Sequence, residues 1–427
     1  MVEKSNVPEI RFAGFADPWE QRKLGDIAQR VTRKNESCES DLPLTISAQY
    51  GLVDQRTYFN AQVASKNMSG YYLLHRGEFA YNKSTSTDSP WGAVKRLVEY
   101  DKGCVSTLYI CFALHGAAPE YLVTYYETDR WYKEIQKIAA EGARNHGLLN
   151  ISPDDFFESK LVVPEQQSEQ HLIGSLFARL DALITLHQRK YDKLGELKKS
   201  LLEKMFPKEG EVFPEIRFAG FADPWEQRKL GNELLFLRNN TLSRADLNGV
   251  QGDALDVHYG DVLVKYGAVL NVAKTTLPRI TKSGQPGKTL GDPLNDGDII
   301  MSDTAEDETA GKCSELCEIR DRTVYSGLHT IPCRPRRKYA SGFLGHYLNA
   351  PVFHNQLIPL MQGIKVISLS KTSLSEANLV VPSIREQEKI SATFSRLDTL
   401  ITLHQRKLEL LRNIKKALLD KMFVEGE

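Results

Sequence analysis

The chain has 427 residues, which at roughly 100 to 200 residues per domain corresponds to about two to four domains with cores of ordinary size. Apolar residues make up 41% of the sequence and charged residues 26%, and the 55 Lys and Arg residues balance the 55 Asp and Glu residues. This composition is typical of a globular protein. A formal charge of zero removes net charge as an argument for nucleic-acid binding, so such a function must rest on local organisation.

The beginning of the sequence, MVEKSNVPEIRF, carries charges where a secretory signal needs an apolar stretch, and the sequence has no apolar run that approaches a membrane span. We therefore expect a cytoplasmic protein with no membrane contact. The cysteines, scattered without a CxxC pair, are Cys38, Cys104, Cys111, Cys313, Cys317 and Cys333. Because no second ligand pair follows the CxxxC of Cys313 and Cys317, we expect reduced structural thiols and no metal.

An internal repeat organises the chain. The segment PEIRFAGFADPWEQRKLG occurs at residues 8–25 and again, unchanged, at residues 214–231. A second segment, LDALITLHQRK at residues 180–190, returns as LDTLITLHQRK at residues 397–407, and the two copies stay alignable from an EQ dipeptide to the tripeptide KMF. The tetrapeptide LVVP precedes each copy. The chain therefore runs twice through a short repeat, a variable region and a long repeat.

The two variable regions, residues 26–159 and 232–378, differ in sequence but keep the same order of signals. Each contains a short apolar strand entered by a glycine turn, GEFAY in the first and GDIIM in the second. Each then has a further strand, predicted at residues 104–114 and 324–333. A helix with apolar residues at helical spacing follows, predicted at residues 119–140 in the first region and 341–361 in the second. The pattern predicts two domains of one mixed α/β fold, α+β in character, with different surfaces.

The long repeat has the heptad period of a coiled coil over about five heptads. The positions that we expect to pair the two helices are Ile173, Leu176, Leu180, Leu183, His187, Leu194, Leu197 and Leu201 in the first copy. In the second copy they are Ile390, Leu397, Leu400, His404, Leu411, Ile414 and Leu418. We expect two long antiparallel coiled-coil helices related by a pseudo-two-fold axis, which separate the two globular domains.

This antiparallel arrangement explains the place of the short repeat. Residues 8–25 would meet the end of the second helix, and residues 214–231 directly follow the first helix, which gives two equivalent junctions. His187 and His404 interrupt the apolar seam, and a polar residue in such a seam commonly fixes its register. The alternative is that both histidines are half-exposed seam residues.

These signals predict four parts. The first domain with its junction peptide covers residues 1–164, and a central helix covers residues 165–210. The second domain with its junction peptide covers residues 211–382, and a C-terminal helix covers residues 383–427.

The sequence lacks the common signatures of an enzyme. It contains no HExxH, no GxSxG and no GxGxxG after a strand. The segment GQPGKT at residues 284–289 lacks the glycine that a phosphate loop carries four residues before its GK pair, so we interpret it as a solvated turn. The Asn- or Asp-Pro-Pro-aromatic segment of a DNA-methylating enzyme is also missing. We expect a chain that catalyses no reaction by itself.

Basic and polar side chains collect in both variable regions, and these are the side chains that pair with phosphates and base edges. In the first region the candidates for DNA contact are Lys83, Ser84, Ser86, Thr87, Lys95, Arg96, Arg144 and Asn145, with His146 beside them. In the second they are Lys265, Asn271, Lys274, Thr275, Arg279, Arg334, Arg336, Arg337 and Lys338, with Lys288 nearby. The alternative for each of them is an ordinary solvated loop residue.

One loop carries the wrong charge for phosphate contact. The segment DTAEDETA at residues 303–310 holds four acids at the position that corresponds to the polar loop STSTDSPW of the first region. We expect this loop to face away from a duplex. The alternative is that one acid accepts a hydrogen bond from a cytosine amino group.

Two unlike domains, two repeated helices and a duplicated junction peptide together resemble the specificity subunit of type I restriction and modification systems. The likeness covers nearly the whole chain, and its most specific residues are the PEIRFAGFADPWEQRKLG segments and the series LVVP, EQ, LDxLITLHQRK and KMF. The resemblance implies that residues 26–159 and 232–378 are target recognition domains, each reading one half of a split, asymmetric sequence in double-stranded DNA. It also implies that the helices set the spacer and dock two modification subunits.

The resemblance further implies a non-catalytic subunit of a multisubunit methyltransferase and endonuclease. S-adenosylmethionine would bind to the modification subunits, ATP and Mg to the restriction subunits, and no cofactor to this chain. A hypothesis from a different class is a protein-interaction scaffold without a DNA role, which the neutral net charge favours. An autonomous enzyme is the third class, and the missing signatures argue against it.

Overall fold

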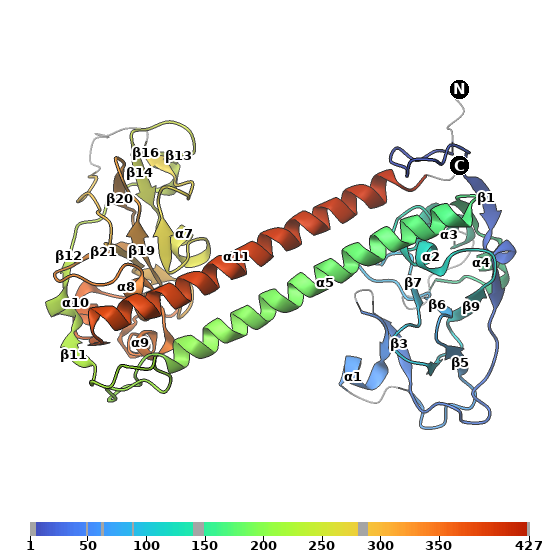
Figure 1. Cartoon of the computed structure of the whole chain (residues 1–427), viewed down its shortest axis with the longest axis horizontal. Helices are drawn as coiled ribbons and strands as arrows, with labels where there is room; N and C mark the ends of the chain where they lie inside the picture. The colour runs from blue at the N-terminus through green and yellow to red at the C-terminus, as the bar shows by residue number, and fades with distance from the viewer. Residues whose placement is uncertain are drawn as a thin grey trace. The chain divides into compact units, whose positions relative to one another are not determined.

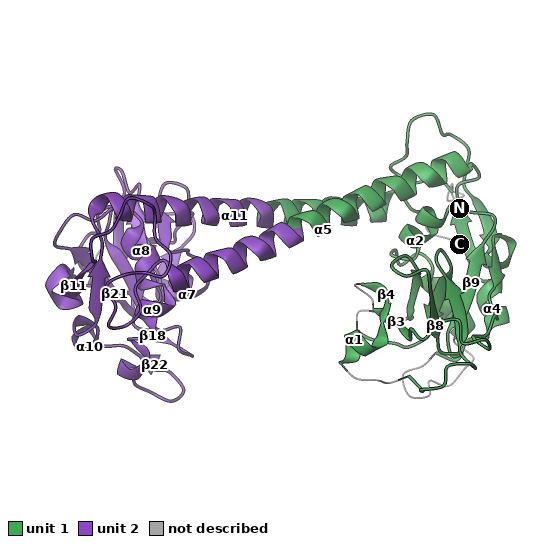
Figure 2. Cartoon of the chain, turned by 60° about the horizontal axis from the view of Figure 1, so that its bottom comes forward, with its two compact units in different colours: residues 1–187, 406–427 green, residues 188–405 purple. Residues whose placement is uncertain are grey.

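The computed structural model describes residues 6–47, 50–60, 64–87, 89–139, 149–280 and 289–424. It divides into two compact units (Figure 2): unit 1 contains Met1–His187 and Arg406–Glu427, and unit 2 contains Gln188–Gln405. Two long helices, α5 (Gln167–Lys204) and α11 (Ile384–Lys421), each begin in one unit and end in the other (Figure 1). The chain therefore connects its units twice, by the two copies of the long repeat.

The main sheet of unit 1 has four antiparallel strands in the order β2-β9-β6-β7. These strands are β2 (Ala28–Arg30), β6 (Phe79–Asn82), β7 (Ala93–Arg96) and β9 (Ile110–Leu114). Two further pairs are β3 (Leu44–Ser47) with β4 (Gly51–Asp54) and β5 (Tyr72–His75) with β8 (Lys102–Val105). The helices of this unit besides α5 and α11 are α1 (Gln55–Phe59), α2 (Pro119–Tyr125), α3 (Tyr132–Ala139) and α4 (Pro153–Glu158), with a 3-10 turn at Leu24–Asp26.

Strand β6 is buried on both faces, which explains its unbroken apolar sequence FAY. Phe79 and Tyr81 belong to one core cluster, in which Phe79 stacks on Phe112 with 5.2 Å between ring centroids. Tyr81 stacks on Phe156 of α4 at 4.6 Å. Ala80 points the other way, into a second cluster, because successive side chains of a strand alternate between its faces. The sheet therefore separates two apolar layers.

The main sheet of unit 2 repeats this order with one strand added, β12-β21-β17-β19-β15. Its strands are β12 (Leu234–Phe236), β15 (Val269–Asn271), β17 (Ile299–Ser302), β19 (Cys313–Cys317) and β21 (Thr330–Pro335). A second sheet is formed by β13 (Leu247–Asn248), β14 (Ala254–Val257), β16 (Arg279–Ile280) and β20 (Thr323–Ser326), and β18 (Thr304–Ala305) pairs with β22 (Ile367–Ser368). The short helices are α6 (Leu230–Glu233), α7 (Tyr259–Val264), α8 (Phe343–Leu348), α9 (Pro351–His354) and α10 (Lys371–Ser375), with 3-10 turns at Arg244–Asp246 and Ile358–Leu360.

The prediction of one mixed α/β fold that occurs twice is confirmed by these sheets, but two details of it were wrong. The helices predicted at residues 119–140 and 341–361 are each broken, into α2 and α3 and into α8 and α9. The Thr128 hydroxyl donates to the Tyr125 carbonyl after α2, and Pro351 starts α9 because it cannot continue a helix. The strands predicted at residues 104–114 and 324–333 are likewise two strands each, separated by a turn.

Each short repeat closes its own unit by pairing with the strand that leads into a long helix. Strand β1 (Glu20–Lys23) is antiparallel to β10 (Lys160–Val163), and β11 (Glu226–Lys229) is antiparallel to β23 (Asn378–Val381). The registers match, because Glu20 lies opposite Val163 and Glu226 lies opposite Val381. Trp19 and Trp225, the tryptophans before these strands, are both buried. The two equivalent junctions predicted from the sequence are therefore present, one in each unit.

The two long helices are antiparallel within each unit. In unit 1 the start of α5 shares a core with the end of α11, and the rings of Phe177 and Phe423 lie 6.0 Å apart. In unit 2 the end of α5 meets the start of α11, and Phe206 stacks on Phe394 at 5.9 Å. The two contacts are equivalent in the repeat, so the internal two-fold likeness of the sequence extends to its packing.

Burial of the predicted helix-pairing residues changes along the helices. Four are buried in the cores of the units, namely Ile173, Leu180, Ile390 and Leu397. Four are 39% to 47% exposed, namely Leu183, Leu197, Leu400 and Ile414. The others, Leu176, Leu194, Leu201, Leu411 and Leu418, are half-buried, as are His187 and His404, each of which takes part in a polar or ring interaction. All four buried positions lie in the first half of their helix, where α5 or α11 packs against the globular part of its unit.

Candidate nucleic-acid interface

The polar loop after β6 presents three of the predicted hydroxyl groups to solvent. Ser84, Ser86 and Thr87 are exposed. The loop is held by a bond from the Ser84 amide to the Asn82 side chain at 3.0 Å and by backbone bonds between Ser86 and Ser89. These hydroxyls lie on a defined turn where a ligand can reach them.

The basic residues around this loop instead make contacts within unit 1. Lys83 Nζ donates to the Ile151 carbonyl at 3.1 Å, and burial lowers the pKa of Lys83. Burial also lowers the pKa of Lys95. Arg96 Nη1 donates to Glu120 Oε1 at 2.8 Å, which ties β7 to α2. Arg144 and Asn145, together with His146, lie outside the described residues.

Three of the candidates in unit 2 line one cavity of about 400 Å³, namely Lys274, Thr275 and Arg279. Arg322, which the sequence reasoning missed, lines the same cavity, with Asp253 and Asp321. The Asn271 side chain accepts from the Lys274 amide at 3.0 Å and so builds the turn that carries Lys274. The only sequence signal for Arg322 was the RDR triplet at residues 320–322. The result is a polar hollow with three cations and two acids.

Backbone contacts hold both arginines of this cavity in place. Arg279 Nη1 donates to the Gly252 carbonyl at 2.8 Å, and Arg322 Nη1 donates to the Val272 carbonyl at 2.6 Å. A guanidinium group has five N–H donors, so each group keeps further donors for a phosphate or a base edge. The cavity can therefore bind an anionic, hydrogen-bonding ligand.

The remaining candidates of unit 2 lie elsewhere. Arg334 donates to Asp298 at 2.9 Å and 2.7 Å, and this bond raises the pKa of Arg334. Arg337 and Lys338 are exposed and line a second cavity of about 390 Å³ together with Arg334, and Arg336 is exposed beside them. Lys265 lies 5.8 Å from the ring centroid of Tyr266, beyond the end of α7, and lines neither cavity.

The acidic segment DTAEDETA contains strand β18, which pairs with β22 outside the two larger sheets of unit 2. Glu306, Asp307 and Glu308 are exposed, and the Asp307 carboxylate accepts from the Thr309 amide at 2.9 Å. The hydrogen bond from the Thr309 hydroxyl, together with the one from its amide, lowers the pKa of Asp307. That this segment faces away from a DNA duplex stays a prediction.

A buried EQ dipeptide organises each junction. Glu169 is 1% exposed and receives two bonds from Arg11, at 2.6 Å and 2.9 Å. Glu386, also 1% exposed, receives two from Arg217, at 2.8 Å and 2.9 Å. In both cases the short repeat is bound to the first turn of a long helix. These bonds raise the pKa values of the two arginines.

The glutamine of the same dipeptide joins the globular domain to the helix. Gln170 accepts from the Ala118 amide at 2.8 Å and donates to the Pro164 carbonyl at 2.8 Å. Gln387 makes the same two contacts, to Ala340 at 3.1 Å and to Pro382 at 2.9 Å. Sequence reasoning found the repeated EQ but not this role, which appears only once the three segments are brought together.

The buried cysteines are thiols, since burial raises the pKa of Cys104 to about 11 and that of Cys111 to about 12.

Among the described residues, no group of three or more His, Cys, Asp or Glu side chains is arranged to hold a metal ion. The helices of the described chain do not include one that is long and apolar enough to cross a membrane.

Comparison with known proteins gives one family match. Residues 276–413 match the model of the type I restriction modification DNA specificity domain. A curated relative, the putative type I restriction enzyme MjaX specificity subunit of Methanocaldococcus jannaschii, is 21% identical over 231 residues, which are 51% of this chain and 49% of that protein. The match thus spans about half the length of each protein.

Solved structures resemble the whole chain. The S subunit of a type I restriction-modification system from M. genitalium aligns with a TM-score of 0.55 and 15% identity, over 99% of this chain and all of that one (100%). This likeness concerns the fold. The HsdS subunit from Thermoanaerobacter tengcongensis aligns with a TM-score of 0.44 and 17% identity, over 96% of this chain and 98% of that one.

Proposed function

We infer that this chain, which carries a type I restriction modification DNA specificity domain at residues 276–413, is the specificity subunit of such a system and reads DNA sequence. The matched segment contains most of the main sheet of unit 2 and most of α11. Unit 1 repeats the same sheet order and the same junction, which supports a second domain of the same kind in the same chain.

The two domains read different halves of one target. Their sheets share an order, but their exposed residues differ: a hydroxyl-rich loop in unit 1 and a cationic cavity in unit 2. Different surfaces recognise different base sequences, so the target is a split, asymmetric sequence in double-stranded DNA. The two long helices set its spacer, and half-sites about 34 to 36 Å apart, roughly one turn of the duplex, fit such a reader.

The single observation that carries this proposal is the duplicated junction. The EQ dipeptides, the Arg–Glu bonds and the strand pairs recur with the same geometry around unlike domains. A fold tolerates many substitutions that keep side-chain volume and the hydrophobic pattern, so folding alone does not require two unchanged junction peptides. Their identity favours two identical partners, one bound at each junction. We assign these partners as two modification subunits, to which restriction subunits are added.

In this proposal the partner subunits catalyse the reactions. The chain is a non-catalytic subunit of a multisubunit methyltransferase and endonuclease. S-adenosylmethionine binds to the modification subunits, ATP with Mg binds to the restriction subunits, and the specificity subunit determines where they act.

The test is DNA binding by the chain alone and by its assembly with the modification subunits. We expect weak, salt-sensitive binding alone and sequence-specific binding in the assembly, because phosphate contacts release counterions. Lys274→Ala and Arg322→Ala should each weaken binding in the assembly by about fivefold or more, corresponding to about 1 kcal/mol or more. Arg320→Ala is the matched control, because Arg320 is exposed nearby but paired with Glu318.

Two outcomes would contradict the proposal. If the assembly bound all DNA sequences with equal affinity, sequence recognition by this chain would be excluded. Unchanged affinity in both cavity variants and in a triple variant of Ser84, Ser86 and Thr87 would support a protein-interaction scaffold, the function that the balance of 55 basic and 55 acidic residues favours.

A further inference from the structure

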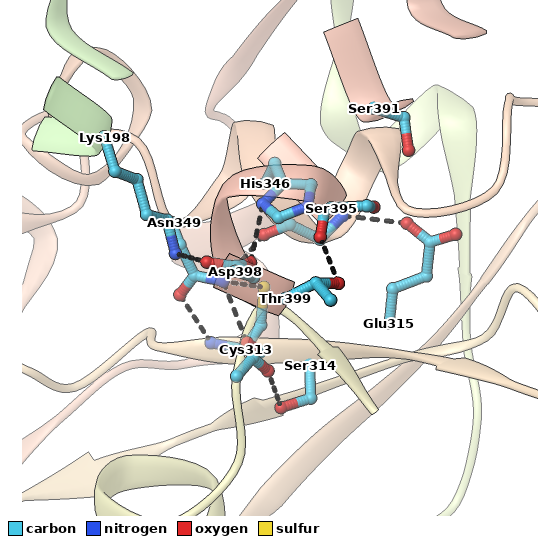
Figure 3. Close-up of polar contacts among 12 residues, drawn as sticks. Lys198, Cys313, Ser314, Glu315, His346, Asn349, Ser391, Ser395, Asp398 and Thr399 are labelled. Carbon is cyan, nitrogen blue, oxygen red and sulfur yellow. Dashed lines mark hydrogen bonds and ion pairs between the residues drawn. The ribbon is translucent and has the colours of Figure 1, made fainter. Parts of the chain in front are cut away.

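The two long helices are joined by reciprocal ion pairs. In unit 1, Lys415 Nζ of α11 lies 2.5 Å from Asp181 Oδ1 of α5. In unit 2, Lys198 Nζ of α5 lies 2.5 Å from Asp398 Oδ1 of α11 (Figure 3). The acids occupy the same place in LDALITL and LDTLITL, and the lysines both begin the KK dipeptide before KMF. Each copy of the repeat thus supplies one acid and one lysine, and each bond joins the acid of one copy to the lysine of the other.

Each ion pair has a further polar neighbour from the globular domain. Glu127, just after α2, lies 2.8 Å from Lys415 Nζ. His346 of α8 lies with its Nδ1 atom 3.9 Å from Asp398 Oδ2. Helices α2 and α8 are equivalent, because the amides of Ala118 and Ala340 before them bind the two repeated glutamines. We call Asp181, Lys415 and Glu127 clasp 1, and Lys198, Asp398 and His346 clasp 2.

The surroundings of the clasps strengthen them. The side chains of Lys415 and Lys198 are 18% and 25% exposed, and His346 is 1% exposed and packs against Phe394 at 5.2 Å between ring centroids. The paired side chains of Asp181 and Asp398 are 45% and 33% exposed, so each pair is partly shielded from water, and removal of one partner leaves a partly buried charge uncompensated. Each clasp therefore holds α5, α11 and one globular domain together at a defined point.

A clasp also specifies register. A helix that slips by one residue moves about 1.5 Å along its axis and turns its side chains by about 100°, and a slip of one turn moves them 5.4 Å. Either slip separates a 2.5 Å ion pair. The apolar seam specifies register less well, since Leu183, Leu197, Leu400 and Ile414 are 39% to 47% exposed. Polar pairs are the usual device where an apolar seam leaves register undetermined.

We propose that the two clasps fix the register of α5 against α11 and the seating of each globular domain on these helices, and thereby select the spacer length at which the two half-sites are read. The proposal rests on the function proposed above. The five charged residues and His346 are positioning residues, because they act through the helices and do not themselves read bases.

Clasp 2 gives the sharper test, because exchanging its two charges leaves a matched pair. In clasp 1 an acid at position 415 would face Glu127. The full chain is assembled with modification subunits, and binding is measured on DNA in which the half-sites are kept and the spacer varies one base pair at a time. The variants are Lys198→Asp, Asp398→Lys and the double exchange.

We expect each single variant to reduce the preference for the best spacer over its neighbours by at least about fivefold, corresponding to about 1 kcal/mol. The bases preferred in each half-site should stay the same. The double exchange should restore most of the spacer preference, which loss of stability alone would not explain. Lys199→Asp is the matched control, because it makes the same charge change at the exposed neighbour of Lys198 and should leave the preference unchanged.

Single variants that keep the full spacer preference would overturn the proposal. A wild-type assembly without any split target would overturn the proposed function instead, so the two failures are distinguishable. If a charge reversal prevents folding, Lys198→Met combined with Asp398→Asn removes both charges with little change in size. A sharp spacer preference in that folded variant would equally exclude the clasp.

Discussion

At the scale of single residues, the polar groups inside unit 2 carry the least obvious consequences. Asp256 of β14 is fully buried, and only its Oδ2 atom has a partner, the Asn240 amide at 2.5 Å. Burial raises the pKa of Asp256 to about 7. His346 is almost as buried, and burial lowers its pKa to about 4. Neither residue could be singled out from the sequence, where both lie in ordinary strand and helix patterns.

Asp256→Asn should stabilise the protein at alkaline pH. The folded-state pKa of Asp256 is above its unfolded value of 3.8, so its contribution is complete at low pH and is lost as the pH rises through about 7. Asparagine has no charged form, so at pH 8 the variant should gain roughly 4 kcal/mol in free energy of unfolding over the wild type. Urea denaturation at pH 5 and pH 8 measures this, and an equal difference at both values would contradict it.

His346→Gln should remove an acid-sensitive part of the stability. The folded-state pKa of about 4 lies below the unfolded value of 6.5, so the contribution is complete above about pH 6.5 and is lost as the pH falls to about 4. The wild type should lose on the order of 3 kcal/mol relative to the variant over this range. Asp256 acts in the opposite direction, so only the difference between wild type and variant is informative. If the free energy of unfolding had the same pH dependence in the wild type and the variant, the burial of His346 would be contradicted.

At the scale of elements, small residues set how closely the long helices approach the domains. Gly174 of α5 faces the start of α2, and a Cβ atom there would lie 2.6 Å from Glu120 Cβ. In unit 2 the equivalent helix position is Ser391, and the glycine is on the other side: a Cβ on Gly342 would lie 2.7 Å from Ser391 Oγ. The long helix thus approaches the domain equally closely in both units, but the glycine lies on the long helix in unit 1 and just before α8 of the domain in unit 2.

Gly174→Ala should therefore destabilise unit 1, although alanine is the better helix former. The clash involves the backbone of α2 as well as Glu120, so we expect a cost of about 1 to 3 kcal/mol. Gly195→Ala in the same helix is the matched control, because nothing lies within 4 Å of its added Cβ, and it should gain about 1 kcal/mol. Thermal denaturation measures the stability of both variants. An equal change in stability for the two would contradict the close packing of Gly174 against α2.

The repeat made the elements easier to predict than the contacts. Because two copies of each segment stand in one sequence, the helices, the junction strands and the shared fold could be inferred from the recurrence. Local breaks could not be inferred: the bond from the Thr128 hydroxyl to the Tyr125 carbonyl after α2 and the proline at the start of α9 each concern a single turn within a longer apolar pattern. The predicted cations Arg96 and Arg334 are held by Glu120 and Asp298, partners that only the fold brings near them.

At the scale of the whole molecule, the repeat means that half of the chain contains both kinds of clasp residue. A fragment ending near Gly210 keeps Asp181 and Lys198 on one helix. A second copy can then supply the opposite partners by two-fold symmetry. We expect this fragment to form a dimer, and Lys198→Asp to weaken it. Sedimentation analysis measures this, and a folded fragment that stays monomeric would contradict the pairing of the helices.

The composition predicted little at this scale, because a net charge of zero conceals how charge is distributed. The cationic cavity of unit 2 gathers Lys274, Arg279 and Arg322 from separate strands and turns, while the acids of residues 303–310 flank strand β18 of another strand pair. Such groupings depend on strand order and register, which no single segment encodes. The proposed DNA role therefore rests on the duplicated junction, with support from the family match at residues 276–413.

The most direct test of bipartite DNA reading is to map methylated bases in a genome that carries the complete system, with and without this chain. The account predicts one modified sequence with two unlike halves separated by a fixed number of base pairs, which disappears when the chain is deleted. An unbroken or palindromic modified sequence, or one that persists after deletion, would contradict it.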